Sequence, residues 1–265
     1  MSIEQFVDEW EESNDDMELA KIKEYWEIRA DEFNNKDKSN YDEIVRFMDE
    51  VGIINNSYNI LDIGCGPGKL SLQVSSRVKS ITGIDISENM IYHARENAKQ
   101  KKIDNTHFKV ASWEEIDLKN EGWEKKFDVV IASMTPGIKS FETLNKMIEG
   151  SKKYCFLSSY VHRRDLRNEI EEYIGEKKKD DSNSKIYYVF NILWKLGYFP
   201  EIRYKDIDIT NEFTYDKALE IYLVQFSAEG EKKKKIEEFL QMKTNMDGMV
   251  VQKYQAKIAW MSWQV

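Results

Sequence analysis

The sequence predicts an α/β fold in which helices cover both faces of a doubly wound, parallel sheet. Short apolar runs alternate with amphipathic helical segments through residues 59–160, as in consecutive β-α-β units. A glycine-rich turn from Gly64 to Gly68 joins the first strand to a helix, and the acidic residue Asp85 ends the next strand. In open sheets of this class, ligands bind where the strands end, so both features lie at the expected ligand edge.

Each expected strand is a short apolar run bounded by polar or turn residues. The expected strands are 59–63, 80–85, 106–110, 127–133, 153–160, 200–209 and about 250–263. In the last of these, Tyr254 and Ala256 alternate with Gln255 and Lys257, which indicates a strand with two different faces.

Apolar residues at helical spacing predict the helices. Before the sheet, such a stripe consists of Trp10, Leu19, Ile22, Tyr25, Trp26 and Phe33. The expected helices are 2–12, 16–33, 41–51, 68–79, 88–101, 140–149, 165–178, 183–196 and a helical stretch over 214–240. Gly197 and Pro200 fit the end of the helix over 183–196, because glycine favours the position after a helix and proline cannot continue one.

Length and composition fit one large domain, or one domain with a cap. The chain has 265 residues and a net charge of -9, which argues against a broad nucleic-acid-binding face. Two cysteines, Cys65 and Cys155, make neither a disulfide framework nor a metal cluster, so no metal is expected. Reduced thiols, no visible signal peptide and no long apolar run predict a cytoplasmic protein without a membrane partner. The oligomeric state cannot be predicted.

The spacing of the glycines disfavours two common nucleotide sites. A phosphate-binding P-loop would need glycine at Ile63 and a hydroxyl residue at Leu70, and a dinucleotide turn would need its third glycine at Lys69. Asp62, two residues before the first glycine, would repel a diphosphate but suits a cationic amino acid group. S-adenosylmethionine carries a sulfonium and an ammonium group and no phosphate.

At Asp62-Ile63-Gly64-Cys65-Gly66-Pro67-Gly68 and at Asp85 the chain resembles the class I S-adenosylmethionine-dependent methyltransferases, whose first two motifs are an acidic residue before GxGxG and an acid ending the second strand. The resemblance runs from about residue 20 to residue 160 and, more weakly, to the C-terminus. It implies S-adenosylmethionine as cofactor and a mostly parallel, seven-stranded Rossmann-like sheet whose last strand is inserted antiparallel.

The resemblance also suggests how the chain is divided. Residues 1–52 are expected to form an N-terminal helical lid, and 53–265 the methyltransferase domain, with helical cap elements at about 165–196 and 210–240. The segment YWEIRADEF, Tyr25 to Phe33, resembles the lid of many small-molecule methyltransferases. A helix packed on the domain is the alternative interpretation of this segment.

The expected cofactor-binding residues follow the ends of the first four strands. They are Asp62, Gly64, Cys65, Gly66, Gly68, Asp85, Ile86, Ser112, Trp113 and Ser133. Asp85 would bind the two ribose hydroxyls, and Ile86 would pack on the adenine. Where the family often has an acid that bonds the adenine amino group, this chain has Ser112, which with Glu115 also fits a helix capping box.

The expected acceptor-binding residues are Tyr25, Trp26, Met134, Thr135, Tyr160 and His162. Met134 and Thr135 lie in the loop SMTPG after the fourth strand, which lacks the Asn/Asp-Pro-Pro-aromatic motif of base methyltransferases and so disfavours DNA methylation. Tyr160 and His162, expected just after the fifth strand, are the candidate catalytic bases, because histidine accepts protons near pH 7. A solvated polar loop is the alternative there. The neighbouring arginines could hold a carboxylate or phosphate.

These features predict an S-adenosylmethionine-dependent methyltransferase that acts on a small molecule by in-line displacement. That reaction needs no catalytic nucleophile, so the absence of an obvious triad is expected. One alternative is methylation of RNA or protein, to which the run from Lys232 to Lys235 would contribute, although flanking glutamates favour a solvated helix face. Another is a non-catalytic protein that binds S-adenosylmethionine.

Overall fold

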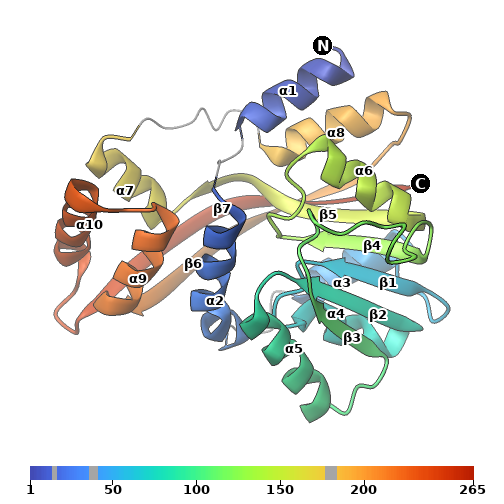
Figure 1. Ribbon diagram of the computed structural model, residues 1–265, viewed down its shortest axis with the longest axis horizontal. Coiled ribbons are helices and arrows are strands. Elements are labelled where there is room, and N and C mark those ends of the chain that lie inside the picture. The colour runs from blue at the N-terminus through green and yellow to red at the C-terminus, as the bar shows by residue number, and fades with distance from the viewer. Residues whose placement is uncertain (14–16, 36–40, 177–183) are drawn as a thin grey trace.

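The computed structural model describes residues 1–13, 17–35, 41–176 and 184–265. Its described strands form one sheet of seven, in the order β3-β2-β1-β4-β5-β7-β6 (Figure 1). Strands β1 to β5 are parallel, and β7 lies antiparallel between β5 and β6. The predicted doubly wound, mostly parallel sheet with an inserted antiparallel strand is therefore confirmed. Predicted helix residues 16, 177–178 and 183 lie outside the described residues.

The first four strands have the predicted bounds, whereas the last three are longer than predicted. The strands are β1 (Asn59–Ile63), β2 (Ser80–Asp85), β3 (Thr106–Val110), β4 (Phe127–Ser133), β5 (Ser151–Arg164), β6 (Glu201–Thr214) and β7 (Met249–Gln264). Strands β5, β6 and β7 have 14 to 16 residues each, against 5 to 7 for the others. The three long strands therefore extend past the rest of the sheet.

The helices lie close to their predicted ranges, with two exceptions. They are α1 (Ile3–Ser13), α2 (Leu19–Asn35), α3 (Tyr41–Glu50), α4 (Lys69–Val74), α5 (Glu88–Gln100), α6 (Phe141–Gly150), α7 (Leu166–Ile174), α8 (Lys185–Lys195), α9 (Tyr215–Gln225) and α10 (Gly230–Lys243). The predicted helix 68–79 becomes α4 followed by a 3-10 helix, Ser75–Arg77. The stretch 214–240 divides into α9 and α10, with Ser227 at positive φ between them and Gly230, also at positive φ, as the first residue of α10. No described helix combines the length and apolarity that crossing a membrane requires.

Both faces of the sheet are buried, which explains why its central strands read as continuous apolar runs. Along β1 the side chains alternate between two cores. Leu61 and Ile63 belong to the core that α1, α6 and α8 cover, and Ile60 to the core that α3 and α4 cover. The result is a three-layer sandwich with the glycine turn at the carboxyl end of β1.

The extended parts of β5, β6 and β7 carry a separate cap made of α7, α9 and α10 (Figure 1). This cap has its own apolar core, which includes Ile170, Phe213, Tyr222 and Leu240. Helix α8, which the sequence placed in a cap with α7, packs instead with α1 against the sheet. Helix α2 lies between the cap and α5 (Figure 1).

Residues 161–164, predicted to follow the fifth strand, are part of β5. Tyr160 pairs with Ile258 of β7 and His162 pairs with Lys257, with an irregularity in register between the two pairs. The alternative interpretation, a solvated polar loop, is therefore wrong for these residues. Strand β7 pairs with this segment at every residue except Val161, and the sequence of a single chain does not show that pairing.

Candidate functional site

The glycine turn between β1 and α4 closes against the loop that follows β4. Gly64, Gly66 and Gly68 have φ of 67°, 53° and 75°, which favours glycine at all three positions. A Cβ on Gly64 would lie 2.1 Å from the Thr135 Oγ1. The turn and the β4 loop are therefore in direct contact, and that contact requires glycine at position 64.

Asp85 ties the turn to the end of β2. Its Oδ2 accepts a hydrogen bond from the Gly66 N–H at 2.9 Å, and its Oδ1 accepts one from the Ser87 N–H at 2.9 Å. Ser87, rather than Asp85, caps α5, since its Oγ accepts from the Met90 N–H at 3.1 Å. Burial raises the pKa of Asp85, and the two N–H bonds oppose that rise.

Asp62 is a second buried carboxyl beside the first. It is 3% exposed, and its Oδ2 accepts a hydrogen bond of 2.6 Å from the Ser71 hydroxyl. Burial raises the pKa of Asp62 to about 7; the Ser71 bond opposes this rise, and the charge of Asp85 adds to it. Two acidic groups facing one cavity attract a cationic ligand and repel a phosphate.

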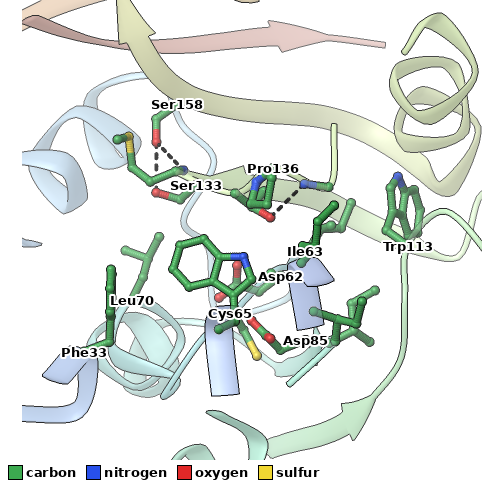
Figure 2. A pocket seen from close by; sticks show the side chains of 18 of the residues that line it. Phe33, Asp62, Ile63, Cys65, Leu70, Asp85, Trp113, Ser133, Pro136 and Ser158 are labelled. Carbon is green, nitrogen blue, oxygen red and sulfur yellow. Dashed lines mark hydrogen bonds between the residues drawn. The ribbon is translucent and has the colours of Figure 1, made fainter. Parts of the chain in front are cut away.

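A first cavity of about 310 Å³ lies at the carboxyl ends of β1, β2 and β4 (Figure 2). Figure 2 shows Phe33 and Leu70 at one side, Trp113 at the other, and Asp62 and Asp85 between them. The predicted cofactor residues that line this cavity are Asp62, Gly64, Cys65, Asp85, Ile86, Ser112, Trp113 and Ser133. The predicted residues Gly66 and Gly68 shape the turn without lining the cavity.

Hydrogen bonds fix the wall formed by the β4 loop. The Ser158 Oγ accepts from the Met134 N–H at 3.1 Å and lies 3.0 Å from the Ser133 Oγ. On the opposite side, the Trp113 indole donates to the Thr143 carbonyl at 3.1 Å, which holds the ring in place. The predicted capping box at Ser112 is wrong, because residues 113–115 form a turn and no helix starts there.

A second, larger cavity of about 830 Å³ adjoins the first. It lies between α2, the extended strands and α9. The two cavities share the wall residues Ile22, Trp26, Phe33, Met134, Thr135, Pro136 and Ile207. The two cavities are therefore adjacent, and these side chains border both of them.

Most of the predicted acceptor residues line the second cavity. These are Tyr25, Trp26, Met134, Thr135 and Tyr160. His162 does not: its side chain is exposed, whereas Tyr160 and Arg163 on the same strand line the cavity. The register irregularity between Tyr160 and His162 changes the simple alternation of faces along β5.

Several charged residues of the second cavity were not predicted. Arg29 of α2, Arg167 of α7 and Lys185 of α8 all line it. In the sequence they lie in helical segments, where a charged residue usually marks a solvated face. Only Lys185 carried a sign of its position in the sequence, because it directly precedes the apolar run from Ile186 to Phe190, which indicates a buried helix.

Helix α2 is fastened over the first cavity by polar contacts with α5. The Glu27 carboxylate accepts from the Glu88 N–H at 2.6 Å and the Asn89 N–H at 3.0 Å, at the start of α5. Lys23 pairs with Glu88 at 2.7 Å, and further along the helix His93 bonds to Asp31 at 2.9 Å. A carboxylate at a helix N-terminus is favourable because the N–H groups there lack partners in the helix.

Comparison with known proteins identifies relatives of this arrangement. The family model described as "Methyltransferase domain" matches residues 54–192, just over half of the chain. A protein of Invertebrate iridescent virus 6 that is named as a methyltransferase is 29% identical over 188 residues, which are 68% of this chain and 64% of the viral protein. Ribosomal RNA small subunit methyltransferase A of Wigglesworthia glossinidia brevipalpis is 28% identical over 178 residues, 66% of this chain and 60% of that protein.

These matches span less than two thirds of the length of either curated relative. Among solved structures, the chain resembles phosphoethanolamine N-methyltransferase 2 of Haemonchus contortus in complex with S-adenosyl-L-methionine, with a TM-score of 0.53 and 17% identity. That likeness covers 89% of this chain and 56% of the other, and at this identity it shows a shared fold.

Proposed function

This chain belongs to the class I S-adenosylmethionine-dependent methyltransferases, and from that membership we propose that it methylates a small-molecule acceptor bound in the second cavity. The family match rests on residues 54–192, which contain the glycine turn, both buried carboxyls and the β4 loop. The second cavity also draws on elements outside that match, namely α2, β6, α9 and β7.

The first cavity fits S-adenosylmethionine. The ligand has a ribose diol for Asp85 and a cationic amino acid group for the neighbourhood of Asp62, and it brings no phosphate to the two acids. Asp85 keeps acceptor capacity beyond its two N–H bonds, since a carboxylate can accept about four. Ile86, Ser112 and Trp113 would then surround the adenine.

Two adjoining cavities with a common wall are the observation that supports a small-molecule acceptor. The second cavity is within the usual size range of small-molecule sites, about 300–1,000 Å³. Its apolar lining includes Ile209, Phe213 and Ile221, and its polar lining includes Tyr160 and Gln252. A mix of apolar walls and a few polar groups is typical of a site that surrounds its ligand.

The cofactor, when bound, supplies an activated methyl group for in-line displacement. The chain's own residues would align the acceptor and exclude water. Trp26 and Phe33 of α2 line both cavities and would shield the point of transfer, and Thr135 would flank it from the other side. Tyr160 is the remaining candidate for contact with the acceptor, since His162 points away from both cavities.

Calorimetry tests the cofactor site. S-adenosylmethionine and S-adenosylhomocysteine should bind with micromolar affinity, and NAD should not bind. Asp85→Ala should weaken the binding by about 1–3 kcal/mol, because polar partners lose their acceptor. Asp104→Ala, at an exposed position away from the cavity, is the matched control and should leave the affinity unchanged. Tight NAD binding, or unchanged affinity in Asp85→Ala, would contradict the assignment.

Incubation of cell extract with methyl-labelled cofactor tests the class of acceptor. Label in the low-molecular-weight fraction supports the proposal. Label in RNA or protein would favour the second interpretation, in line with the similarity to a ribosomal RNA methyltransferase. Cofactor binding without transfer to any fraction would indicate a non-catalytic binding protein.

A further inference from the structure

The lining of the second cavity is strongly cationic, although the chain as a whole has an excess of nine acidic residues. One carboxylate, Asp165, faces the cavity among the described residues. The cationic side chains that line it are Arg29, Lys139, Arg163, Arg167 and Lys185. Such a local excess of one sign is unusual in an acidic protein, and it attracts ligands of the opposite sign.

Three of these cations are matched by carboxylates that lie outside the cavity lining. The Arg29 guanidinium holds Glu32 through two bonds of 2.8 Å, from Nε to Oε2 and from Nη2 to Oε1. Arg167 bonds to Glu171 at 2.8 Å, and Lys139 pairs with Glu114 at 2.7 Å. These pairs serve the protein's own structure, which leaves Lys185 and Arg163 as the cations most available to a ligand.

Lys185 is the first of these two. Its Nζ donates one hydrogen bond, of 3.1 Å, to the Thr135 carbonyl, and the described residues give it no ion pair. A lysine ammonium has three donors, so capacity remains for a ligand in the cavity. Burial lowers the pKa of Lys185 to about 8, because burial disfavours the charged form of an amine.

Arg163 is the second. Its contact with a carboxylate is loose, with the Nε 3.7 Å from the Asp165 Oδ2. Asp165 already caps α7, because its Oδ1 accepts from the Arg167 N–H at 2.9 Å. The Arg163 guanidinium lies over the Tyr160 ring, 5.3 Å from its centroid, and it is the planar, bidentate type of donor that binds carboxylates and phosphates well.

Lys185 also lies next to the junction of the two cavities, since Thr135 lines both. Apolar side chains cover another part of the second cavity: Ile207, Ile209 and Phe213 alternate along one face of β6. The cavity thus offers an apolar surface together with two cations that the protein neutralises weakly or not at all within its described residues.

We propose that the methyl acceptor is an organic anion with an apolar body, whose carboxylate or phosphate group is bound by Lys185 with Arg163 as a second cation. This inference rests on the proposed function, because it names the class of acceptor for the same cavity. The anionic group of the acceptor would supply the negative charge that Lys185 does not receive from the described residues. The apolar part of the acceptor would lie against β6.

The test separates the two proposals. Low-molecular-weight cell extract is divided on an anion-exchange column before the reaction, and each fraction is incubated with the wild-type protein and methyl-labelled S-adenosylmethionine. Label in the retained, anionic fraction supports the inference. Label restricted to the neutral and cationic fractions overturns the inference and leaves the proposed function standing, whereas no label in any small-molecule fraction overturns the proposed function itself.

The active anionic fraction then identifies the group and the residue. Treatment with a phosphatase before the assay removes activity if the anion is a phosphate monoester, and leaves it if the anion is a carboxylate. Lys185→Met should raise the apparent KM for that fraction about tenfold or more, with a smaller effect on kcat, and Lys185→Arg should restore part of the loss. An unchanged KM in Lys185→Met would overturn the assignment of Lys185.

Two controls keep this result interpretable. Lys195→Met changes an exposed lysine of the same helix and should leave the KM unchanged. The affinity of Lys185→Met for S-adenosylhomocysteine, measured by calorimetry, should equal that of the wild type, which shows that the variant is folded and that the first cavity is intact. If Lys185→Met does not fold, the same KM comparison is made with Arg163→Gln.

Discussion

At the scale of single residues, Asp62 predicts how cofactor binding responds to pH. Its pKa is raised by burial from 3.8 to about 7, so the carboxyl is ionised above neutral pH and protonated below it. A cationic ligand binds the ionised form better. Affinity for S-adenosylmethionine should therefore fall as the pH drops below about 7, by at most about tenfold per pH unit. Calorimetry over that range checks this, and Asp62→Asn should flatten the profile.

The raised pKa of Asp62 affects the stability of the ligand-free protein in the opposite direction: it favours low pH, whereas cofactor binding favours high pH. The carboxyl of Asp62 ionises near 3.8 in the unfolded chain and near 7 in the folded one, so the folded state binds more protons between these values. The free energy of unfolding should then decrease as the pH rises from about 4 to about 7 as far as this group is concerned. Comparing thermal unfolding of the wild type and Asp62→Asn isolates this contribution.

Gly64 allows a prediction with an internal control. Gly64 and Gly122 have nearly the same φ, 67° and 63°, but a Cβ at Gly64 would meet Thr135 while a Cβ at Gly122 meets nothing within 4 Å. Gly122→Ala should cost about 1 kcal/mol for the backbone strain, and Gly64→Ala clearly more because of the overlap. Denaturant unfolding measures both variants.

The second-site variant completes that test. In Gly64→Ala, the further change Thr135→Gly removes the overlapping atoms and should recover part of the lost stability and cofactor affinity. Equal destabilisation by Gly64→Ala and Gly122→Ala would show that the turn and the β4 loop do not press on one another.

Among single residues, the sequence predicted those that depend on local pattern. Asp62, Gly64 and Asp85 lie at or just after the ends of strands with clear apolar runs, so their place at the sheet edge could be predicted. His162 was placed wrongly because its orientation depends on a register irregularity opposite β7. Lys185 and Arg167 could not be predicted as cavity residues, since only the packing of α7 and α8 brings them there.

At the scale of elements, α2 contributes Ile22, Trp26 and Phe33 to the lining of both cavities. Glu27 fastens it to the N-terminus of α5 through two backbone N–H groups. Glu27→Gln should loosen this contact by about 0.5–1 kcal/mol and raise the dissociation rate of S-adenosylmethionine. Stopped-flow fluorescence measures that rate, and Glu24→Gln, an exposed glutamate on the same helix, should have no effect. Equal rates in both variants would contradict the role of Glu27.

The sequence predicted the bounds of β1 to β4 correctly, but it predicted β5, β6 and β7 too short. From Asp206 on, β6 alternates polar with apolar residues, and beyond the predicted end at residue 209 it runs through Thr210, Asn211 and Glu212, so its apolar pattern weakens before the strand ends. There β7 alone supplies the hydrogen bonds, from Asp206 opposite Lys257 to Thr214 opposite Met249. The sequence of neither strand alone indicates that it pairs with a segment about 50 residues away, so the full length of β6 could not be predicted.

At the scale of the whole molecule, the charge distribution predicts no affinity for RNA. The basic run of α10 is largely matched by acids: Lys232 pairs with Glu176, Lys233 with Glu237 and Lys235 with Glu231. A labelled RNA oligonucleotide should show no change in fluorescence anisotropy at physiological salt with about 10 µM protein, within the usual range of non-specific binding.

A charge-reversed variant controls that assay. Changing Glu229, Glu231, Glu237 and Glu238 to lysine creates a basic helix face, and this variant should bind the same RNA with a strong dependence on salt. Salt-dependent binding by the wild type would contradict the prediction and favour a nucleic-acid acceptor.

The position of β7 between β5 and β6 has a consequence for synthesis on the ribosome. Strands β1 to β5 can pair in the order in which they emerge, but β6 finds no neighbour until residues 249–264 have left the exit tunnel. Until then the nascent chain exposes two long open strand edges, the kind of surface that chaperones shield. Strands β1, β2 and β4, whose ends line the first cavity, can thus assemble during translation, while β6 and β7, which line the second cavity, pair only at the end.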